Sequence, residues 1–389
     1  MVTIKKSLHL LTAAFFALLP LASNAETVQD TTVHVEATAV AHDAAHEAHD
    51  EAHAEGHAEQ TNQEFVNGFI QHHLMDDHYY SFFADKEEHR HYGFSLPIIL
   101  LDGSLKVFMS SEEFVYNGEV VENDGQYYKY YHGKIYKTDA EGTINNDEHH
   151  HPTNEKPLDL SITKNVVGLL LATVLLFLGF TALAKTYKNS ANSIPTGVAR
   201  FLEPLVIYVR DEMARPNIGD KKYKQFMPYL LSVFFLIFLL NLLGLTPLGL
   251  NVTGNISVTV CLALFTFLYT NLKANADYWK HIFWMPGVPV PMKIVLAPIE
   301  VLGMFTKPFS LLIRLFANIT AGHSVVMGLI AVAYLMKETL STPGAMGVSF
   351  ALTTFLTFLE ILVAFLQAFI FTMLSSLFIG SAVQEHDHH

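Results

Sequence analysis

Long apolar runs fill the second half of the chain, from Thr163 onward, and short polar segments separate them. About 20 apolar residues cross the hydrocarbon core of a bilayer as an α-helix. Runs near that length predict membrane helices at residues 166–183, 227–245 and 256–272. The run at 294–304 is shorter and interrupted, so we expect it to lie along the membrane interface.

The last two apolar runs, at 309–336 and 346–383, are longer than a bilayer requires. This length predicts helices that are strongly tilted or curved, or that extend past the membrane. Between them lies Ser341-Thr342-Pro343-Gly344, which is typical of a turn. The two runs therefore predict a long helical hairpin.

The first 160 residues follow a different pattern. Residues 1–25 predict a cleaved secretory signal, with two lysines, a short apolar stretch and small residues at the end. Residues 26–63 are of low complexity, and residues 64–160 predict a small folded α+β unit that begins with an amphipathic helix at 64–83. Four β-prone segments follow that helix, at 94–101, 105–109, 114–121 and 127–136.

The low-complexity segment is rich in alanine, histidine and acidic residues. Histidines spaced three or four apart would form one stripe on a helix, and they are His42, His46, His49, His53 and His57. Such a stripe is one hypothesis for a metal site, whereas the composition favours a solvated tail. The folded unit at 64–160 holds a second group of histidines, which are either a metal cluster or ordinary surface residues. They are His72, His73, His78, His89 and His91.

Charge divides the chain into two parts. Residues 26–160 contain 27 Asp/Glu and 7 Lys/Arg, a formal charge of −20, and residues 161–389 have a formal charge of +5. The single cysteine, Cys261, excludes a disulfide scaffold. The chain has no long basic stripe and no glycine-rich phosphate-binding motif. We therefore expect no nucleic-acid partner and no cofactor.

The distribution of lysine and arginine predicts the orientation in the membrane. Residues 185–224 hold eight Lys/Arg against four acids, and the turn at 246–254 holds none. We expect the first segment in the cytoplasm, together with residues 385–389, and the hairpin tip outside. The expected signal peptide independently places the unit at 64–160 in the periplasm. Residues 195–214 predict an amphipathic helix at the interface.

Ionisable residues within apolar helices are costly, about 2.5–3.5 kcal/mol each at mid-bilayer, and so indicate function. The predicted hairpin carries Arg314 and His323 on its first helix and Glu360 and Gln367 on its second. Residues at equal depth in an antiparallel hairpin have a constant sum of residue numbers. Arg314 should therefore lie level with Gln367, and His323 level with Glu360.

Guanidinium stays protonated at any relevant pH, whereas His and Glu relay protons near neutrality. Helical spacing places Ser310, Arg314 and Asn318 on one stripe, with His323 on the opposite side. This pattern describes an offset proton path gated by a fixed cation. The alternative is a hairpin held together by buried polar contacts. Glu300 and Lys307 are either a structural pair or part of the inner path.

Three segments resemble the a subunit of F-type ATP synthases. The segment from Thr306 to Asn318, followed by Ala321-Gly322, resembles the arginine helix of that family. Leu366 to Phe371 resembles its last helix, and Asn241 to Pro247 resembles an element that closes its second span. The resemblance covers roughly 160–383 and does not extend to residues 26–160, which are similar to an outer extension of some bacterial members.

The resemblance implies a role for each matching residue. Arg314 would be the stator arginine facing a ring of c subunits, with Ser310, Asn318 and Glu300 along an inner half-channel. The outer half-channel would be lined by His323, Glu360, Gln367 and Asn255. Relative to some members His323 and Glu360 are exchanged, and Asn255 replaces an acid. The implied partners are the c ring, the b subunit of the stator stalk, other ATP synthase subunits and membrane lipid.

We therefore predict an all-α polytopic membrane protein with about five membrane helices in residues 161–384. They end in a long tilted hairpin and follow a small α+β periplasmic unit. The predicted function is proton translocation in a rotary ATP synthase of the inner membrane, without catalysis of phosphoryl transfer by this chain. The alternatives are an ion-coupled secondary transporter, which would show internal repeats, and a membrane-anchored periplasmic metal-binding protein.

Overall fold

A computed structural model describes residues 76, 78–85, 90–109, 115, 118–131, 133–147, 152–189, 197–246, 250–285, 288–335 and 342–383. The predicted signal peptide, the low-complexity segment with its five histidines, and the C-terminal tail lie outside these residues. So do His72, His73 and His89.

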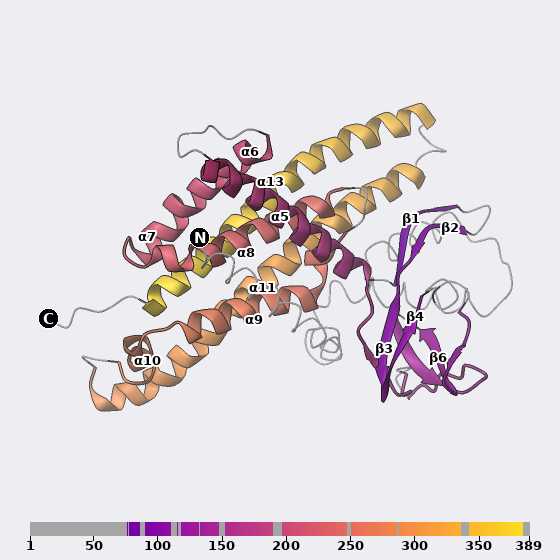
Figure 1. The fold of residues 1–389 in the computed structure, drawn as a ribbon, viewed down its shortest axis with the longest axis horizontal. Coiled ribbons are helices and arrows are strands. Elements are labelled where there is room, and N and C mark those ends of the chain that lie inside the picture. The colour runs from indigo at the N-terminus through magenta and orange to yellow at the C-terminus, as the bar shows by residue number, and fades with distance from the viewer. Residues whose placement is uncertain are drawn as a thin grey trace.

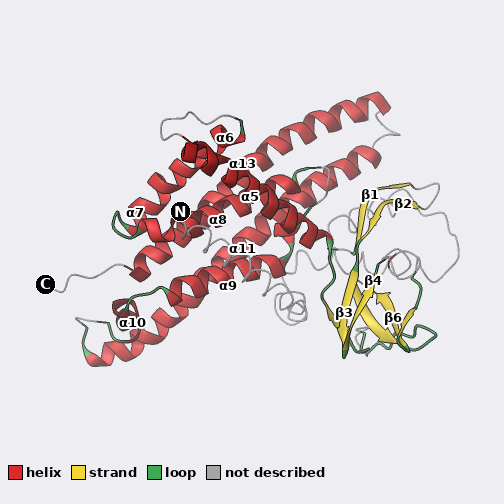
Figure 2. Ribbon diagram, in the orientation of Figure 1, coloured by secondary structure: helices red, strands yellow, loops and turns green. Residues whose placement is uncertain are grey.

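The described second half of the chain is helical (Figures 1 and 2). Its long helices are α5 (Lys164–Asn189), α8 (Tyr223–Gly244), α9 (Ile256–Leu272), α11 (Val290–Leu335) and α13 (Thr342–Val383). Among the described residues, four helices are long and apolar enough to cross a membrane, and five if α9 and α10 (Ala276–Phe283), bent by 104°, form one span. The predicted class, a polytopic helical membrane protein, is confirmed.

The interruption predicted at 294–304 is wrong, because these residues belong to the continuous 46-residue helix α11. Pro298 and Pro308 lie inside that helix. A proline leaves one backbone carbonyl group of the helix without its hydrogen-bond donor. In membrane helices neighbouring groups satisfy such carbonyls, so proline does not end a helix there as it does in water. The predicted turn is also displaced: α13 begins at Thr342, with Pro343 in its first turn, where its missing N–H is not needed.

Shorter helical elements connect α5 to α8. They are α6 (Val198–Tyr208), the π-helical η2 (Val209–Ala214) and α7 (Arg215–Ile218). Ala199, Leu202, Val209 and Met213 are buried on one side of these elements. The amphipathic helix predicted at 195–214 is therefore present from Val198.

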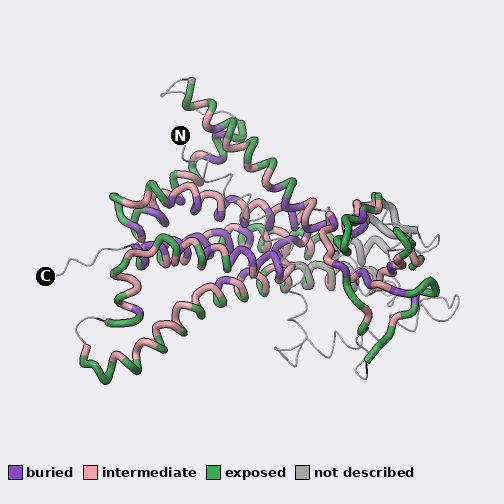
Figure 3. The backbone as a smooth tube through the Cα atoms, turned by 60° about the horizontal axis from the view of Figure 1, so that its bottom comes forward, coloured by how far each residue is buried: buried purple, intermediate pink, exposed green. Residues whose placement is uncertain are grey.

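Aromatic and aliphatic side chains from α5 to α13 form the core of the helical part. Tyr229 on α8 stacks on Tyr269 on α9 with ring centroids 4.3 Å apart, and its hydroxyl donates to Thr266 at 2.7 Å. Helix α13 packs on α8 and α11, and α9 packs on α11. By contrast, α11 and the first half of α13 carry many exposed residues, as Figure 3 shows.

Helix α13 is fixed at its C-terminal end by close contacts. A Cβ added at Gly380 would collide with the backbone carbonyl oxygen of Asn217 on α7, so only glycine allows this approach. The Asn217 amide donates to Ser376 Oγ at 2.8 Å. Lys222 and Asn275 both donate to the carbonyl oxygen of Val383, at 2.9 and 2.8 Å, which satisfies a terminal acceptor.

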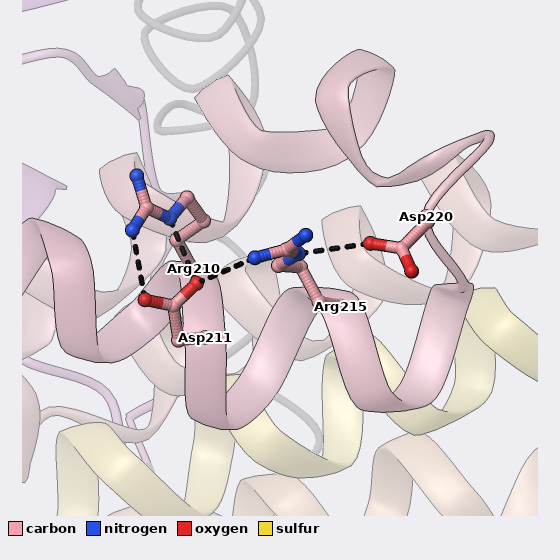
Figure 4. A network of polar contacts seen from close by, with 4 residues as sticks. All are labelled: Arg210, Asp211, Arg215 and Asp220. Carbon is pink, nitrogen blue, oxygen red and sulfur yellow. Dashed lines mark hydrogen bonds and ion pairs between the residues drawn. The ribbon is translucent and has the colours of Figure 1, made fainter.

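An ion-pair network lies on the solvent-exposed side of η2 and α7 (Figure 4). Arg210 donates twice to Asp211, with both distances 2.8 Å, and Arg215 bridges Asp211 and Asp220 at 3.3 and 2.9 Å. The Arg210 guanidinium, helped by Arg215, lowers the pKa of Asp211 to about 2. The network therefore stays ionised throughout the physiological pH range.

The N-terminal unit contains three small antiparallel sheets. Their orders are β1-β2, β4-β3-β8 and β5-β6-β7. The strands are β1 (Tyr79–Asp85), β2 (Arg90–Ser95), β3 (Ile98–Asp102), β4 (Ser104–Phe108), β5 (Val121–Asn123), β6 (Gln126–Tyr131), β7 (Lys134–Thr138) and β8 (Leu158–Asp159). Ile98, Leu100, Tyr128 and Ile135 form the apolar core of this unit.

Several local predictions for this unit are wrong. Of the helix expected at 64–83, residues 64–75 and 77 lie outside the described residues, and the part from Tyr79 is a strand, because pairing with β2 and the aromatic content favour β-structure. Pro97 lies where the segment 94–101 divides into β2 and β3. The segment 127–136 is two strands joined at Gly133, whose φ of +77° suits a tight turn. In the segment 114–121, residues 115 and 118–121 are described, and among them only Val121 is in a strand.

The three sheets lie beyond one end of the helices, and α13 ends at the opposite end, near the C-terminus (Figure 1). The start of α13 and the end of α11 lie at the same end as the sheets. This arrangement agrees with the prediction that the N-terminal unit and the hairpin tip share one side of the membrane.

Candidate functional site

Arg314 lies on an open stripe of α11. Ser310, Ile313 and Ala317 are exposed around it, whereas Leu311 and Leu315 are buried against the bundle. The guanidinium is half-buried and has no hydrogen bond or ion pair with any described residue. Apolar residues of α13 are exposed as well, among them Phe355, Leu359, Leu362 and Leu366. A cation within a membrane helix usually pairs with another group, so the lack of such a group among the described residues makes Arg314 a candidate functional residue.

Asn318 joins α11 to α13. Its amide Nδ2 donates to Gln367 Oε1 at 2.7 Å. Gln367 is only 1% exposed, and Asn318 is exposed. The sequence analysis placed Gln367 level with Arg314, and the observed partner lies one helical turn further along α11. The bond fixes the register of the hairpin next to the arginine.

A cavity of about 310 Å³ lies between the hairpin and the bundle. Four different elements each contribute a polar side chain to its lining. These side chains are Asn241 (α8), Thr253 (η3, Val252–Gly254), Asn318 (α11) and Glu360 (α13). The remaining lining residues are apolar or glycine. A space of this size with several polar groups holds water.

Glu360 faces Gly322 across the cavity. A Cβ added at Gly322 would lie 3.1 Å from Glu360 Oε1, so the small residue leaves room for the carboxyl group. His323 follows Gly322 on α11, and its side chain lies outside the described ones. Gly322 thus lies level with Glu360, which agrees with the equal depth predicted for the adjacent His323 and Glu360.

Asn241 and Thr253 were not predicted as site residues. Thr253 Oγ1 donates to Asn241 Oδ1 at 2.8 Å, and both side chains are buried. The Nδ2 atom of Asn241 has no hydrogen-bond partner among the described residues. A buried amide of this kind requires a water molecule, which agrees with a hydrated cavity. The sequence signal was present, because Asn241 is a polar residue near the end of an apolar span.

Asn255 lies at the start of α9. Its Oδ1 accepts from the backbone N–H of Ser257 at 2.9 Å, and this N-cap explains the local helix start. Its Nδ2 donates to Asp76 Oδ2 at 3.5 Å. Asp76 is a third residue that was not predicted, since it precedes β1 and is distant in sequence from the membrane helices.

The other predicted residues lie apart from this cavity. Ser310 is exposed on the Arg314 stripe, and Glu300 is half-buried nearer the start of α11. No ion pair joins Glu300 to Lys307 among the described side chains, so the structural pair is not formed. Instead, the ammonium of Lys307 lies 5.4 Å from the ring centroid of Phe378.

Among the described residues, His78 bears on the predicted choice between a metal cluster and ordinary surface histidines. His78 Nε2 bonds to Asp159 Oδ2 at 2.9 Å. Although burial of Asp159 opposes its ionisation, His78 and Ser161 hold the pKa of its carboxyl below the usual value. Within the described part of the chain, no three potential metal-binding side chains lie together.

Two family models match the chain. One, described as ATP synthase A chain, matches residues 166–380, and the other, a domain of unknown function (DUF8433), matches residues 69–160.

Curated relatives match the same membrane part. ATP synthase subunit a 2 of Chlorobaculum tepidum is 46% identical over 237 residues, 59% of this chain and 66% of the relative. ATP synthase subunit a of Chloroherpeton thalassium is 44% identical over 236 residues, 59% of this chain and 69% of the relative. This chain thus spans about two thirds of the length of these relatives. The helices, the family model and the relatives agree: the chain is a multi-pass membrane protein that belongs to the ATP synthase subunit a family.

Proposed function

We propose that this chain is the proton-conducting stator subunit of a rotary ATP synthase. Two half-channels reach the middle of the membrane from opposite sides and are separated by Arg314. A proton enters through one half-channel, neutralises a carboxylate on a rotating ring of c subunits, and leaves through the other after the ring has turned.

The observation that carries this proposal is the position of Arg314 on an open apolar face, without an ion pair to any side chain that the structure describes. A guanidinium keeps its charge at any relevant pH, so it favours an ionised carboxylate on the surface that faces it. It also repels a proton moving directly between the two half-channels. The exposed residues of α11 and α13 around it supply an apolar surface for the helices of the ring.

The cavity with Asn241, Thr253, Asn318 and Glu360 supports an outer half-channel. Asn318 shares this cavity with Glu360, so we assign it to the outer half-channel and not to the inner one that the resemblance implied. Glu360 and His323 relay protons there, and Gln367 and Asn255 stabilise the walls through their hydrogen bonds. The exposed Ser310, with Glu300 further along α11, supports an inner half-channel. In this arrangement the N-terminal unit lies in the periplasm, and the cytoplasmic side receives the b subunits of the stator stalk.

Cysteine cross-linking in the assembled complex tests this assignment. Ile313 is 47% exposed beside Arg314, whereas the native Cys261 is buried. Ile313→Cys should form a cross-link to the c subunit with a short bifunctional reagent. Leu178→Cys is the matched control, because Leu178 is exposed on α5, away from the hairpin. Equal cross-linking from both positions, or none from position 313, would contradict the proposed ring surface.

A further inference from the structure

Asp76 joins the N-terminal unit to the membrane helices. Its Oδ1 accepts from the backbone N–H of Asn165 at 3.2 Å, and its Oδ2 accepts from Thr163 Oγ1 at 3.1 Å and from Asn255 Nδ2 at 3.5 Å. Asn165 lies in the first turn of α5, and Asn255 caps the start of α9. One carboxyl group from the N-terminal unit therefore lies where two membrane helices start.

Polar groups continue from Asp76 toward the cavity. Asn255 lies two residues after Thr253, and Thr253 donates to Asn241 in the cavity wall. The free Nδ2 of Asn241 indicates water at this end of the cavity. Asp76 is thus bonded to Asn255, two residues from the wall of the cavity that Glu360 also lines.

We propose that Asp76 is the proton-exchanging carboxyl group at the outer entrance of the channel, contributed to the membrane part by the N-terminal unit. This inference rests on the proposed function. In each step, a hydronium ion outside transfers a proton to Asp76 and becomes water. The neutral carboxyl group then gives that proton to a water molecule of the cavity, which passes it toward Glu360 and leaves Asp76 ionised.

The surroundings of Asp76 suit such an exchange. Burial raises the pKa of its carboxyl, although the Asn165 N–H, His78, Thr163 and Lys164 act in the opposite direction. His78 is itself bonded to Asp159. A carboxyl group with a raised pKa takes up and releases protons closer to neutral pH than a solvated one does.

A purely structural role makes a different prediction. In that case Asp76 only caps α5 and attaches the N-terminal unit to the helices. Loss of any contact in the junction would then reduce assembly, and the pH dependence of proton flow would stay the same.

The test uses the complete ATP synthase in vesicles, with ATP synthesis driven by an imposed proton gradient at a series of outer pH values. The variants are Asp76→Asn, which keeps the shape and an acceptor, and Asp76→Glu, which keeps the acid. Thr163→Ala removes one contact of the carboxylate but no titratable group. Asp124→Asn is the matched charge control, because Asp124 is exposed in the β5–β6 turn. Rates are normalised to the amount of assembled complex.

The expected result is a roughly tenfold or greater fall in rate for Asp76→Asn, with a weaker dependence on outer pH. Asp76→Glu should restore most of the rate with a shifted pH profile. Thr163→Ala should keep most of the rate and move the profile toward higher pH, because the Thr163 hydroxyl lowers the pKa of Asp76. Asp124→Asn should keep the wild-type profile. If Asp76→Asn fails to assemble, the pH profile of Asp76→Glu tests the proposal: a shifted profile supports it, and a wild-type profile contradicts it. A wild-type profile in both Asp76 variants, or equal effects of Thr163→Ala and Asp76→Asn, would overturn the inference. The proposed function itself fails only if Arg314→Ala still pumps protons.

Discussion

The hydrogen bond between Asn318 and Gln367 predicts an asymmetric response to mutation. Gln367 is 1% exposed, so Asn318→Leu leaves its Oε1 acceptor buried without a donor. Leaving a buried polar group unsatisfied costs about 1–3 kcal/mol. Gln367→Leu leaves Asn318 Nδ2 at the cavity, where water replaces the lost acceptor. Asn318→Leu should therefore destabilise the protein more than Gln367→Leu.

A double-mutant cycle measures the bond itself. Hydrogen bonds between membrane helices have coupling energies of about 0.6 kcal/mol on average and up to about 1.7 kcal/mol. At 2.7 Å and with one buried partner, this bond belongs in the upper half of that range. Unfolding of the detergent-solubilised chain is measured for the wild type, both single variants and the double variant.

Two results would refute this reasoning. The first is additivity of the single changes within about 0.3–0.5 kcal/mol, the value typical of residues that do not interact. The second is a larger loss of stability for Gln367→Leu than for Asn318→Leu, which would mean that Asn318, not Gln367, is the buried partner.

Two further changes test the rest of the structure. Gly380→Ala should destabilise the packing of α7 on α13 by about 1–3 kcal/mol, because the new Cβ collides with the backbone of Asn217. Thermal unfolding measures this loss, and Gly303→Ala is the control, because a Cβ at position 303 enters open space. Asp159→Asn should lower the stability of the N-terminal unit at pH 7 by about 1–3 kcal/mol, because it loses the ionised partner of His78. Since the folded pKa of Asp159 is lowered, its stabilisation is complete above the usual carboxyl pKa and is lost as the pH falls through the folded value. Unfolding followed by near-UV circular dichroism at a series of acid pH values should show that the stability of the variant depends less on pH than that of the wild type. An equal dependence of stability on pH in both proteins would contradict the role of Asp159.

The membrane helices were predictable because apolar run length alone defines a span. The same reasoning failed at residues 294–304, where the apolar run is short and interrupted. In the structure the apolar surroundings preserve α11 through both of its prolines. Propensity rules learned in water overestimate the effect of proline in such a helix.

The candidate site was predictable only in part. Arg314 and Glu360 are rare ionisable residues in apolar helices, so they are visible in the sequence. Thr253 and Asp76 are ordinary polar residues whose importance arises from contacts across 12 and 179 positions of the chain. The sequence pattern contains no information on such pairings without the fold.

The N-terminal unit was the least predictable part. Its strands are two to seven residues long, and the aromatic run at Tyr79 fits a helix or a strand equally well by pattern. Pairing with β2 decides between them. Short strands depend on partners that only the tertiary structure supplies.

The central role of Arg314 is tested most directly by ATP-driven proton pumping in vesicles that carry Arg314→Ala. Arg200→Ala, a change at an exposed position on α6, is the matched control, and assembly is checked by detergent extraction. We expect normal assembly in both variants, normal pumping for Arg200→Ala and complete loss of pumping for Arg314→Ala. Pumping near the wild-type rate in an assembled Arg314→Ala complex would contradict the central role of Arg314.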